Sequence, residues 1–456
     1  MNPMRSRKRR SLELETRGGK LRIGIVGAGI GGLMAAVALL ESGHDVEIYE
    51  KSRFKSEVGA AICTPPNSSR ILAHYGFDFE QARATTSEDS IYFTDPSDLG
   101  QKRVVPCADF TPKYGAPFCF FHRVDLHSEL RRLATEPTDK RPRSARLHLG
   151  TSVTGVDDDG TLWFEDGTSV RKDLVVAADG IRSAFVSRVV EEAPRAQHHM
   201  SIMRYLVPSE TVLADPEVAG FFVDGLKSLR VVDNVDKRVI IYGCRGGSLQ
   251  NIGLIYPPRL GMDAAGTSNL ARPPAVKCLF VAHSSFSPSS RAGNDISESE
   301  GFASKVMAEF PETIQSICRE AKDVGQWQLF TRAPLERLAR GRVVLIGDAA
   351  HPMPPLRAQG ASMAIEDAAA LGVLLSQVES ADEVPARMDM FNKLRWCRVA
   401  ATQLLSSEHR WDPSQLSAEQ RGYFSGDVPH TEDDVEKYSY EYDVIRDALE
   451  LLKEDR

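Results

Sequence analysis

The chain has 456 residues, more than one ordinary hydrophobic core holds, which indicates two domains and a terminal appendage. Hydrophobic residues make up 42% of the chain and charged residues 26%, a balance typical of globular proteins in water. The net charge of −7 argues against nucleic acid as a partner, and no apolar run approaches the roughly 20 residues that span a bilayer.

The N-terminal segment carries five basic side chains within residues 5–10, and no apolar stretch follows them. It therefore lacks the pattern of a secretory signal, and we expect residues 1–20 to be a disordered basic tail, with nuclear localisation as the alternative. Seven cysteines are scattered along the chain without a Cys-x-x-Cys pair. This usage favours free thiols and a cytoplasmic location, with neither a disulfide framework nor a metal site.

Residues 22–50 have the pattern of a strand, a helix and a second strand. Arg22 to Val26 is an apolar run, Gly29 to Ser42 has helical periodicity, and Asp45 to Glu50 alternates as a strand does. A later helix is expected to begin with Asn67 as its cap and to end at Gly76.

The first strand of this unit ends in Gly27-Ala28-Gly29-Ile30-Gly31-Gly32, a dinucleotide-binding pattern. Gly27 permits a tight turn, Gly29 lets a pyrophosphate approach the backbone, and Gly32 allows the helix to pack closely on the strand. Glu50 ends the second strand, where its carboxylate can accept hydrogen bonds from a ribose hydroxyl. The acid favours an unphosphorylated adenosine ribose, as in FAD or NAD.

The middle of the chain has a different pattern. Asp159-Gly160 and Asp166-Gly167 are hairpin signals that predict a β-meander over residues 151–178. The following runs predict an antiparallel sheet, since no helical segments alternate with them: Ile202–Val207, Leu229–Val232, Arg238–Tyr242 and Ile252–Tyr256. Pro257 to Pro274 is expected to be a long surface loop.

The last third of the chain returns to a buried strand and then becomes helical. Arg342 to Ile346 predicts the strand, and residues 361–377 and 385–405 predict two helices. An acidic tail that contains Tyr438, Tyr440 and Tyr442 ends the chain.

Three further segments, together with the glycine pattern, resemble the flavoprotein aromatic hydroxylases, the family of p-hydroxybenzoate hydroxylase and salicylate hydroxylase. Leu174 to Ser183 is similar to the Asp-Gly motif of that family, and Arg342 to Pro352 is similar to its Gly-Asp motif, with Gln359 to Ala361 after it. His122 to His127 is similar to another family segment. The four motifs occur in the family's order, and the chain most resembles the salicylate-hydroxylase-like enzymes of fungal secondary metabolism.

The resemblance implies bound FAD, with NAD(P)H as a transient co-substrate because no second glycine pattern is present. It implies that Arg123 lies along the ribityl and pyrophosphate and that Asp179 takes part in FAD and NAD(P)H handling. Asp348 can accept a hydrogen bond from a ribityl hydroxyl. The helix that begins near Gly360 and Ala361 would direct its N–H groups at the flavin ring edge, where negative charge accumulates on reduction.

The resemblance also suggests a substrate side. Ala61 and Cys63 belong to a segment similar to the one that faces the cofactor and substrate in salicylate-hydroxylase-like enzymes, although Ala61 departs from the family's glycine. Cys63 stands where some relatives carry a catalytic histidine, so we expect a small cavity-lining residue there. Arg204 and Tyr242 match a functional arginine and its companion tyrosine. Arg204 could hold a phenolate or a carboxylate by charge-assisted hydrogen bonds, and Tyr242 could share that oxyanion.

These features predict an α/β (α+β) protein with a Rossmann-like FAD-binding domain and β-meander, an antiparallel-sheet substrate domain and C-terminal helices. The FAD-binding domain would comprise residues 21–80, 105–190 and 280–395. The substrate domain would comprise residues 81–104 and 191–279. Residues 396–456 would form a helical, acidic extension.

The predicted activity is an FAD-dependent monooxygenation. NAD(P)H and O2 would be used to hydroxylate a small phenolic or other aromatic molecule through a flavin C4a-hydroperoxide, with dearomatising and decarboxylative variants included. Three alternatives stay open: an epoxidase of an indole or prenyl alkene, an FAD oxidoreductase without oxygen transfer, and a non-catalytic flavin- or NAD-binding module. We expect no nucleic acid or membrane partner, and either a monomer or a homodimer.

Overall fold

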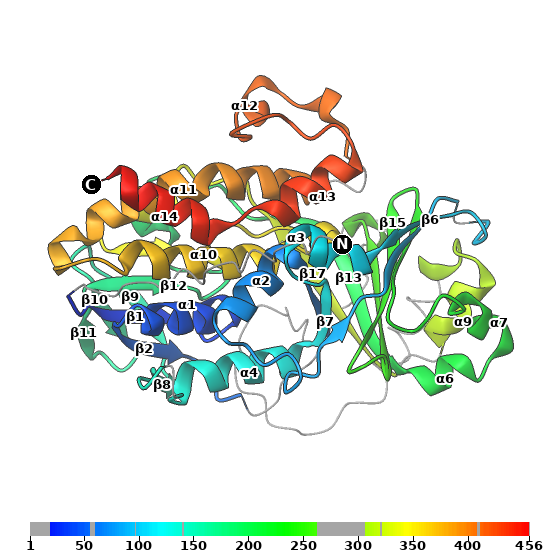
Figure 1. Ribbon diagram of the computed structural model, residues 1–456, viewed down its shortest axis with the longest axis horizontal. Coiled ribbons are helices and arrows are strands. Elements are labelled where there is room, and N and C mark those ends of the chain that lie inside the picture. The colour runs from blue at the N-terminus through cyan, green and yellow to red at the C-terminus, as the bar shows by residue number, and fades with distance from the viewer. Residues whose placement is uncertain are drawn as a thin grey trace, which may run out of the picture.

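The computed structural model describes residues 19–54, 60–95, 97–138, 141–261, 306–319, 322–407 and 411–455 (Figure 1). The predicted basic tail up to residue 18 lies outside the described residues. So does the part of the predicted surface loop from residue 262 to residue 274. In the described part of the chain, we find no helix with the length and apolar character that a bilayer crossing requires.

A six-stranded, mostly parallel sheet forms the centre of the first half of the molecule. Its strand order is β18-β19-β12-β1-β2-β8, and only the short edge strand β18 runs antiparallel to its neighbour. The strands span Ala339–Arg340, Val343–Leu345, Leu174–Ala177, Arg22–Val26, Asp45–Glu50 and Arg146–Leu149. The strands predicted at residues 22–26 and 45–50 are confirmed residue for residue.

Helices cover this sheet and bury its apolar side chains. Helix α1 packs against both α10 and α4, and α10 packs in turn against α11 and α14 (Figure 1). These helices span Ile30–Glu41, Gly360–Leu375, Arg123–Thr135, Val384–Leu405 and Val444–Glu454. Helix α10 is buried along almost its whole length, which explains why most of its residues apart from Glu366 and Asp367 are small or apolar.

The predicted β-meander is confirmed as a three-stranded antiparallel sheet with the order β11-β10-β9. Its strands span Ser169–Arg171, Thr161–Phe164 and Val153–Val156. Gly160 and Gly167 occupy the two hairpin turns with φ of 88° and 83°, which side chains other than glycine adopt rarely. The meander delivers the chain directly to β12 at the centre of the main sheet.

A seven-stranded sheet with the order β17-β13-β16-β15-β14-β5-β6 forms the second half. Its strands span Lys322–Thr331, Gln197–Pro208, Leu249–Tyr256, Lys237–Cys244, Leu229–Asn234, Asp89–Phe93 and Lys102–Pro106. The prediction of a purely antiparallel sheet needs one correction, because β14 and β5 pair in parallel. Periodicity along one strand identifies no partner, so this pairing was not visible in the sequence.

Strand β17 also differs from the predicted arrangement. It lies within residues 280–395, which the sequence analysis placed in the FAD-binding domain, yet it pairs with β13 of the seven-stranded sheet. We therefore propose that the substrate domain includes β17, and we keep the other domain limits as proposals. Helices α6, α7 and α9 lie at the outer end of this domain (Figure 1) and span Ser209–Leu213, Pro216–Phe221 and Glu312–Arg319.

Smaller elements join the two halves. A sheet of the order β3-β7-β4 spans Ala61–Thr64, Cys119–His122 and Thr85–Thr86. Helices α2, α3 and α5 span Pro66–His74, Phe110–Tyr114 and Val186–Val189. The C-terminal helices α12 and α13 span Ala418–Arg421 and Glu432–Glu441, and the segment with α12 projects from the body (Figure 1).

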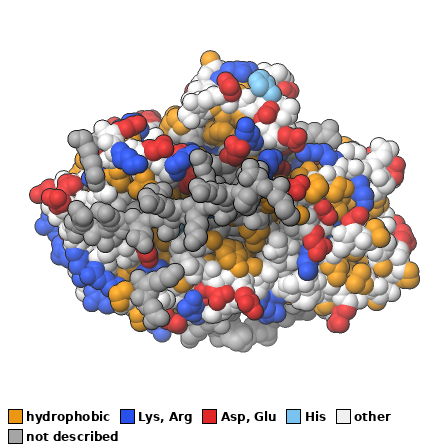
Figure 2. Space-filling view, viewed as in Figure 1, with side chains coloured by type: hydrophobic (Ala, Val, Ile, Leu, Met, Phe, Trp, Pro, Cys, Tyr) orange, Lys and Arg blue, Asp and Glu red, His pale blue; other side chains and the backbone are white. Residues whose placement is uncertain are grey.

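Basic side chains gather at the end of the surface that carries β8 and β11 (Figure 2). Two exposed arginines on these strands are already paired: Arg146 with Glu47, at 2.6 Å, and Arg171 with Asp159, at 3.5 Å. Charge at this end is therefore locally compensated, as on an ordinary solvated surface.

Candidate active site

One cavity of about 810 Å³ lies where the two sheets and the C-terminal segment meet. Most of the residues singled out from the sequence line it: Gly29, Ala61, Cys63, Arg123, Arg204, Tyr242, Asp348, Gly360 and Ala361. Four predicted residues are not part of the wall: Gly27, Gly32, Glu50 and Asp179. The two glycines and Asp179 lie within two residues of a wall residue, and Glu50 accepts a hydrogen bond from Ala28, the neighbour of Gly29. Tertiary structure thus brings four separated motifs to one space.

The three glycines of the dinucleotide-binding pattern have different surroundings. Gly27 has φ of +100°, and a Cβ there would lie 2.5 Å from the carbonyl oxygen of Ala178. A Cβ on Gly32 would lie 2.0 Å from the carbonyl oxygen of Gly27, so this glycine is required for the contact between helix and turn. A Cβ on Gly29 would meet no atom within 4 Å, and Gly29 lines the cavity. The free space at Gly29 fits the pyrophosphate of a dinucleotide.

Glu50 and His127 hold the turn that contains these glycines. Glu50 accepts a hydrogen bond from the Ala28 N–H at 2.8 Å and another from the Ser52 N–H at 2.7 Å. Nε2 of His127 lies 2.8 Å from the carbonyl oxygen of Ala28, which gives His127 a structural role in this turn. Each oxygen of Glu50 keeps acceptor capacity for a ribose hydroxyl, because a carboxylate oxygen has two lone pairs.

Asp348 belongs to the last of the four motifs and lies in the turn that follows strand β19. Burial raises the pKa of its carboxyl to about 6, against the opposing influence of His351, Arg123 and Arg332. Its side chain faces the cavity and accepts no hydrogen bond from another described residue, so its oxygens are available to a ligand hydroxyl.

Helix α10 begins beside Asp348 and directs its first turn at the cavity. No side chain caps this turn, and it contains no acidic residue, so its N–H groups and the positive end of its dipole face the cavity wall at Gly360 and Ala361. Together with Asp348 and the space at Gly29, these groups fit the ribityl, ring and pyrophosphate parts of FAD.

Asp179 and Arg123 flank the same region. Burial raises the pKa of Asp179 to about 6, and its Oδ1 is buried without a hydrogen-bond partner. A buried polar atom of this kind is costly unless a ligand or water completes it. Arg123 begins α4, lines the cavity and lies close enough to Asp348 to oppose its protonation.

Arg204, Tyr242 and Cys63 form a cluster on the substrate side of the cavity. Arg204 comes from β13, Tyr242 from β15 and Cys63 from β3, and all three residues line the cavity. Burial raises the pKa of Cys63 to about 12 and that of Tyr242 well above its usual value. Both groups therefore stay protonated at neutral pH, so Cys63 is neither a base nor a thiolate nucleophile.

Arg204 lines the cavity without a carboxylate partner among the described residues, unlike three other arginines of the lining. Arg238 is bidentate to Asp233, Arg357 is paired with Glu432, and Arg103 is paired with Asp433. Within the described parts of the chain, no carboxylate forms an ion pair with Arg204. The cavity therefore contains a half-buried cation beside a phenolic donor, which is an arrangement suited to an anionic or strongly polarised oxygen.

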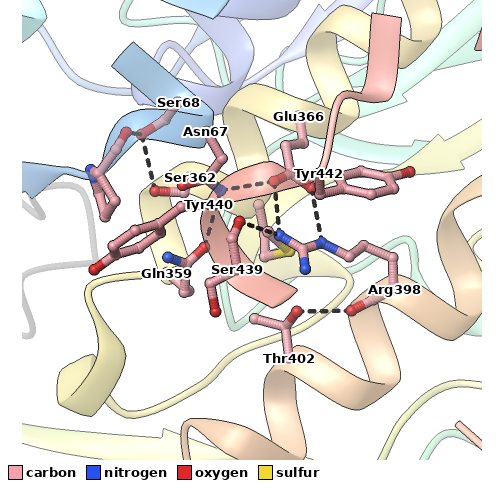
Figure 3. Close-up of polar contacts among 12 residues, drawn as sticks. Asn67, Ser68, Gln359, Ser362, Glu366, Arg398, Thr402, Ser439, Tyr440 and Tyr442 are labelled. Carbon is pink, nitrogen blue, oxygen red and sulfur yellow. Dashed lines mark hydrogen bonds and ion pairs between the residues drawn. The ribbon is translucent and has the colours of Figure 1, made fainter. Parts of the chain in front are cut away.

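Asn67 was predicted to cap α2, and this prediction is wrong. Helix α2 begins after Pro65, and the Asn67 side chain donates instead to Gln359 at 3.0 Å and to Glu366 at 2.7 Å. Pro66 fits the first turn because it needs no N–H partner there. Asn67 thus belongs to a buried polar network between α2 and α10 (Figure 3).

The C-terminal segment also contributes to the cavity, which was not predicted from the sequence. Five of its residues from α13 line the cavity: Glu432, Val435, Glu436, Ser439 and Tyr440. Their spacing is that of one helical face, and this periodicity was the feature of the sequence from which the face could have been predicted. The sequence predicted a helical, acidic extension here and gave no indication of what this face of the helix packs against.

Comparison with known proteins adds independent evidence. Residues 20–223 and 288–405 match the FAD binding domain family. The FAD-dependent monooxygenase cfoG of Aspergillus candidus is 30% identical over 442 residues, 95% of either chain. Hispidin-3-hydroxylase of Neonothopanus nambi is 31% identical over 407 residues, 86% of this chain and 89% of the relative.

Among solved structures, a salicylate hydroxylase substrate complex has the same fold. It superposes with a TM-score of 0.69 at 22% identity, over 95% of this chain and 98% of the other.

Proposed function

Because this chain belongs to the FAD binding domain family of aromatic hydroxylases and is an FAD-dependent monooxygenase, we propose that its substrate is a small phenolic molecule. The proposed reaction consumes NAD(P)H and O2, inserts one oxygen atom into the aromatic ring and releases the other as water. Bound FAD supplies the acceptance of hydride and the activation of oxygen. The remaining task of the protein is to bind, orient and polarise the substrate.

The observation that carries the phenolic assignment is the cluster of Arg204 and Tyr242. A half-buried guanidinium without a carboxylate partner stabilises a phenolate, and the protonated Tyr242 donates a hydrogen bond to the same oxygen. A phenolate has a more electron-rich ring than a phenol, and electrophilic oxygen transfer needs that electron density. The protein thus lowers the barrier by holding the substrate in its reactive charge state.

Other residues serve the cofactor in this proposal. Asp348 accepts a hydrogen bond from a ribityl hydroxyl, Arg123 lies along the pyrophosphate and ribityl, and Gly29 leaves room for the phosphates. The first turn of α10 stabilises negative charge at the ring edge. Ala61 and Cys63 fill the space between cofactor and substrate without titrating.

We further propose a cytoplasmic protein that acts as a monomer or homodimer on a small aromatic molecule and O2. The six cysteines among the described residues are free thiols, which supports a reducing compartment. Cell fractionation with a tagged chain would test the location, and sedimentation of the purified protein would test the oligomeric state.

The decisive experiment is a substrate panel that scores NAD(P)H oxidation together with product mass. Phenols should stimulate NAD(P)H oxidation and gain one oxygen atom. NAD(P)H oxidation without any product of increased mass would instead indicate an oxidoreductase that does not transfer oxygen.

The rival epoxidation of an indole or prenyl alkene makes a different prediction in the same assay. An alkene has no phenolate to stabilise, so Tyr242→Phe would be nearly harmless to an epoxidase. Product formation from alkenes but not from phenols, unaffected by Tyr242→Phe, would replace our proposal.

A further inference from the structure

One face of α13 forms a wall of the active-site cavity. Glu432, Val435, Glu436, Ser439 and Tyr440 line it at positions i, i+3, i+4, i+7 and i+8, the spacing of one helical face. Tyr438 is not part of the wall, because its ring packs against Phe424 and the guanidinium of Arg398. The helix therefore presents Tyr440, and not Tyr438, to the cavity.

Two arginines from different helices are hydrogen-bonded to the backbone at the end of α13. Arg398 on α11 donates to the carbonyl oxygens of Tyr438 and Ser439, at 2.9 and 3.0 Å. Arg70 on α2 donates to the carbonyl oxygens of Tyr440 and Tyr442. Tyr440 and Tyr442 point away from each other along this segment (Figure 3). The backbone on both sides of Tyr440 is thus fixed.

The buried network extends this support to α10. Arg398 is also bound to the Glu366 carboxylate at 3.1 Å, and Asn67 donates to the same carboxylate (Figure 3). Glu366 lies on the second turn of the helix whose first turn lines the cavity. The position of Tyr440 is therefore tied to the helix that we assign to the flavin.

The ring of Tyr440 is held by other aromatic side chains. It packs edge-on against Phe110 and Tyr114, with ring centroids 5.6 and 5.5 Å away, and Phe118 of the same cluster also lines the cavity. Its hydroxyl forms no hydrogen bond with another residue in the described ranges. Burial, with nearby Tyr92 and Glu436, raises the pKa of Tyr440, so the hydroxyl stays a donor.

We propose that Tyr440 is a specificity-determining residue that donates a hydrogen bond to a second oxygen substituent of the aromatic substrate. Arg204 and Tyr242 would hold the first oxygen, and Tyr440 would distinguish diphenols from monophenols. This inference rests on the proposed function. It assigns to the C-terminal segment a direct part in substrate choice.

The test compares Tyr440→Phe with Tyr438→Phe, which alters the opposite side of the same helix. Both substitutions keep the ring and its packing. Dissociation constants of phenol, catechol, resorcinol and hydroquinone would be measured from the change that each causes in the absorbance of the bound FAD. Coupling of NAD(P)H oxidation to product would be measured in parallel.

Wild-type protein should bind at least one diphenol more tightly than phenol. Tyr440→Phe should reduce that preference roughly threefold to tenfold, the worth of one neutral hydrogen bond, and leave phenol binding unchanged. Tyr438→Phe should keep the wild-type preference. Tyr440→Leu, which also removes the ring, should weaken the binding of both classes.

Two results would overturn the inference: an unchanged preference in Tyr440→Phe, or an equal loss of preference in Tyr438→Phe. Failure of the proposed function would look different. In that case the wild-type protein would bind phenols, with or without discrimination, and yield no oxygenated product from any of them.

Discussion

The guanidinium of Arg395 on α11 lies 2.7 Å from the carboxylate of Glu366 on α10, and neither side chain is exposed to solvent. The same guanidinium lies 2.9 Å from Asp367, which is also bound to His351 at 2.6 Å. Burial opposes ionisation of Glu366, but Arg398 and Arg395 keep the pKa of this carboxyl below its usual value. This cluster joins α10, α11 and the C-terminal segment.

Removing one charge from this cluster should destabilise the protein strongly. Glu366→Gln leaves Arg398 with no carboxylate and Arg395 with only Asp367, so the free energy of unfolding should fall by about 3 kcal/mol in urea denaturation. The control is Glu454→Gln, which breaks the exposed pair with Lys393 at 3.7 Å and should cost less than about 1 kcal/mol. Equal losses in the two variants would contradict a structural role for the buried cluster.

Two glycines of the dinucleotide pattern should respond differently to alanine. Gly29→Ala should lose FAD but should melt at a temperature near that of the FAD-free wild-type protein, because its Cβ enters only the space that a ligand fills. Gly32→Ala should lower the melting temperature, since its Cβ would lie 2.0 Å from the Gly27 carbonyl oxygen. Thermal unfolding and the ratio of flavin to protein absorbance measure the two effects. A Gly29→Ala variant that keeps full FAD would argue against pyrophosphate at this position.

The phenolate assignment predicts a graded series at Arg204. Arg204→Gln should raise KM for a phenolic substrate roughly tenfold to a hundredfold, the worth of a charge-assisted hydrogen bond. Arg204→Lys keeps the positive charge and should raise KM by less. Tyr242→Phe should raise KM for the same substrate roughly threefold to tenfold. Arg103→Gln is the control, because Arg103 also lines the cavity but is paired with Asp433. An effect at Arg103 as large as that at Arg204 would indicate general electrostatics instead of a specific anchor.

FAD affinity should depend on pH through Asp348. Burial raises the pKa of this carboxyl to about 6 in the protein, so the acceptor is ionised above that pH and protonated below it. FAD should therefore bind roughly threefold to tenfold more weakly at pH 5 than at pH 7.5, as a charge-assisted hydrogen bond is replaced by a neutral one. Equilibrium dialysis of the apoprotein at several pH values measures the effect.

Asp348→Asn should abolish this pH dependence. Asp179→Asn is the matched control, since burial raises the pKa of Asp179 to about 6 as well. A flat profile in Asp179→Asn with an unchanged profile in Asp348→Asn would assign the titration to Asp179 and correct our placement of the ribityl chain.

Local pattern was enough to predict several elements of this protein. The strands at residues 22–26 and 45–50, the meander turns at Gly160 and Gly167, and helix α11 follow from periodicity and turn chemistry, which act over a few neighbouring residues. The family motifs likewise identified part of the lining of one cavity, because each motif is contiguous in the chain.

Contacts between distant segments were decided only by the tertiary structure. The sequence of β17 does not identify β13 as its partner, and an acidic segment ending in tyrosines looks the same whether it is solvated or closes a cavity. Asn67 fits the rule for a helix cap, yet a buried carboxylate on α10 offers it a stronger hydrogen bond. Such choices depend on which polar groups are buried together, and that is fixed only when the whole chain has packed.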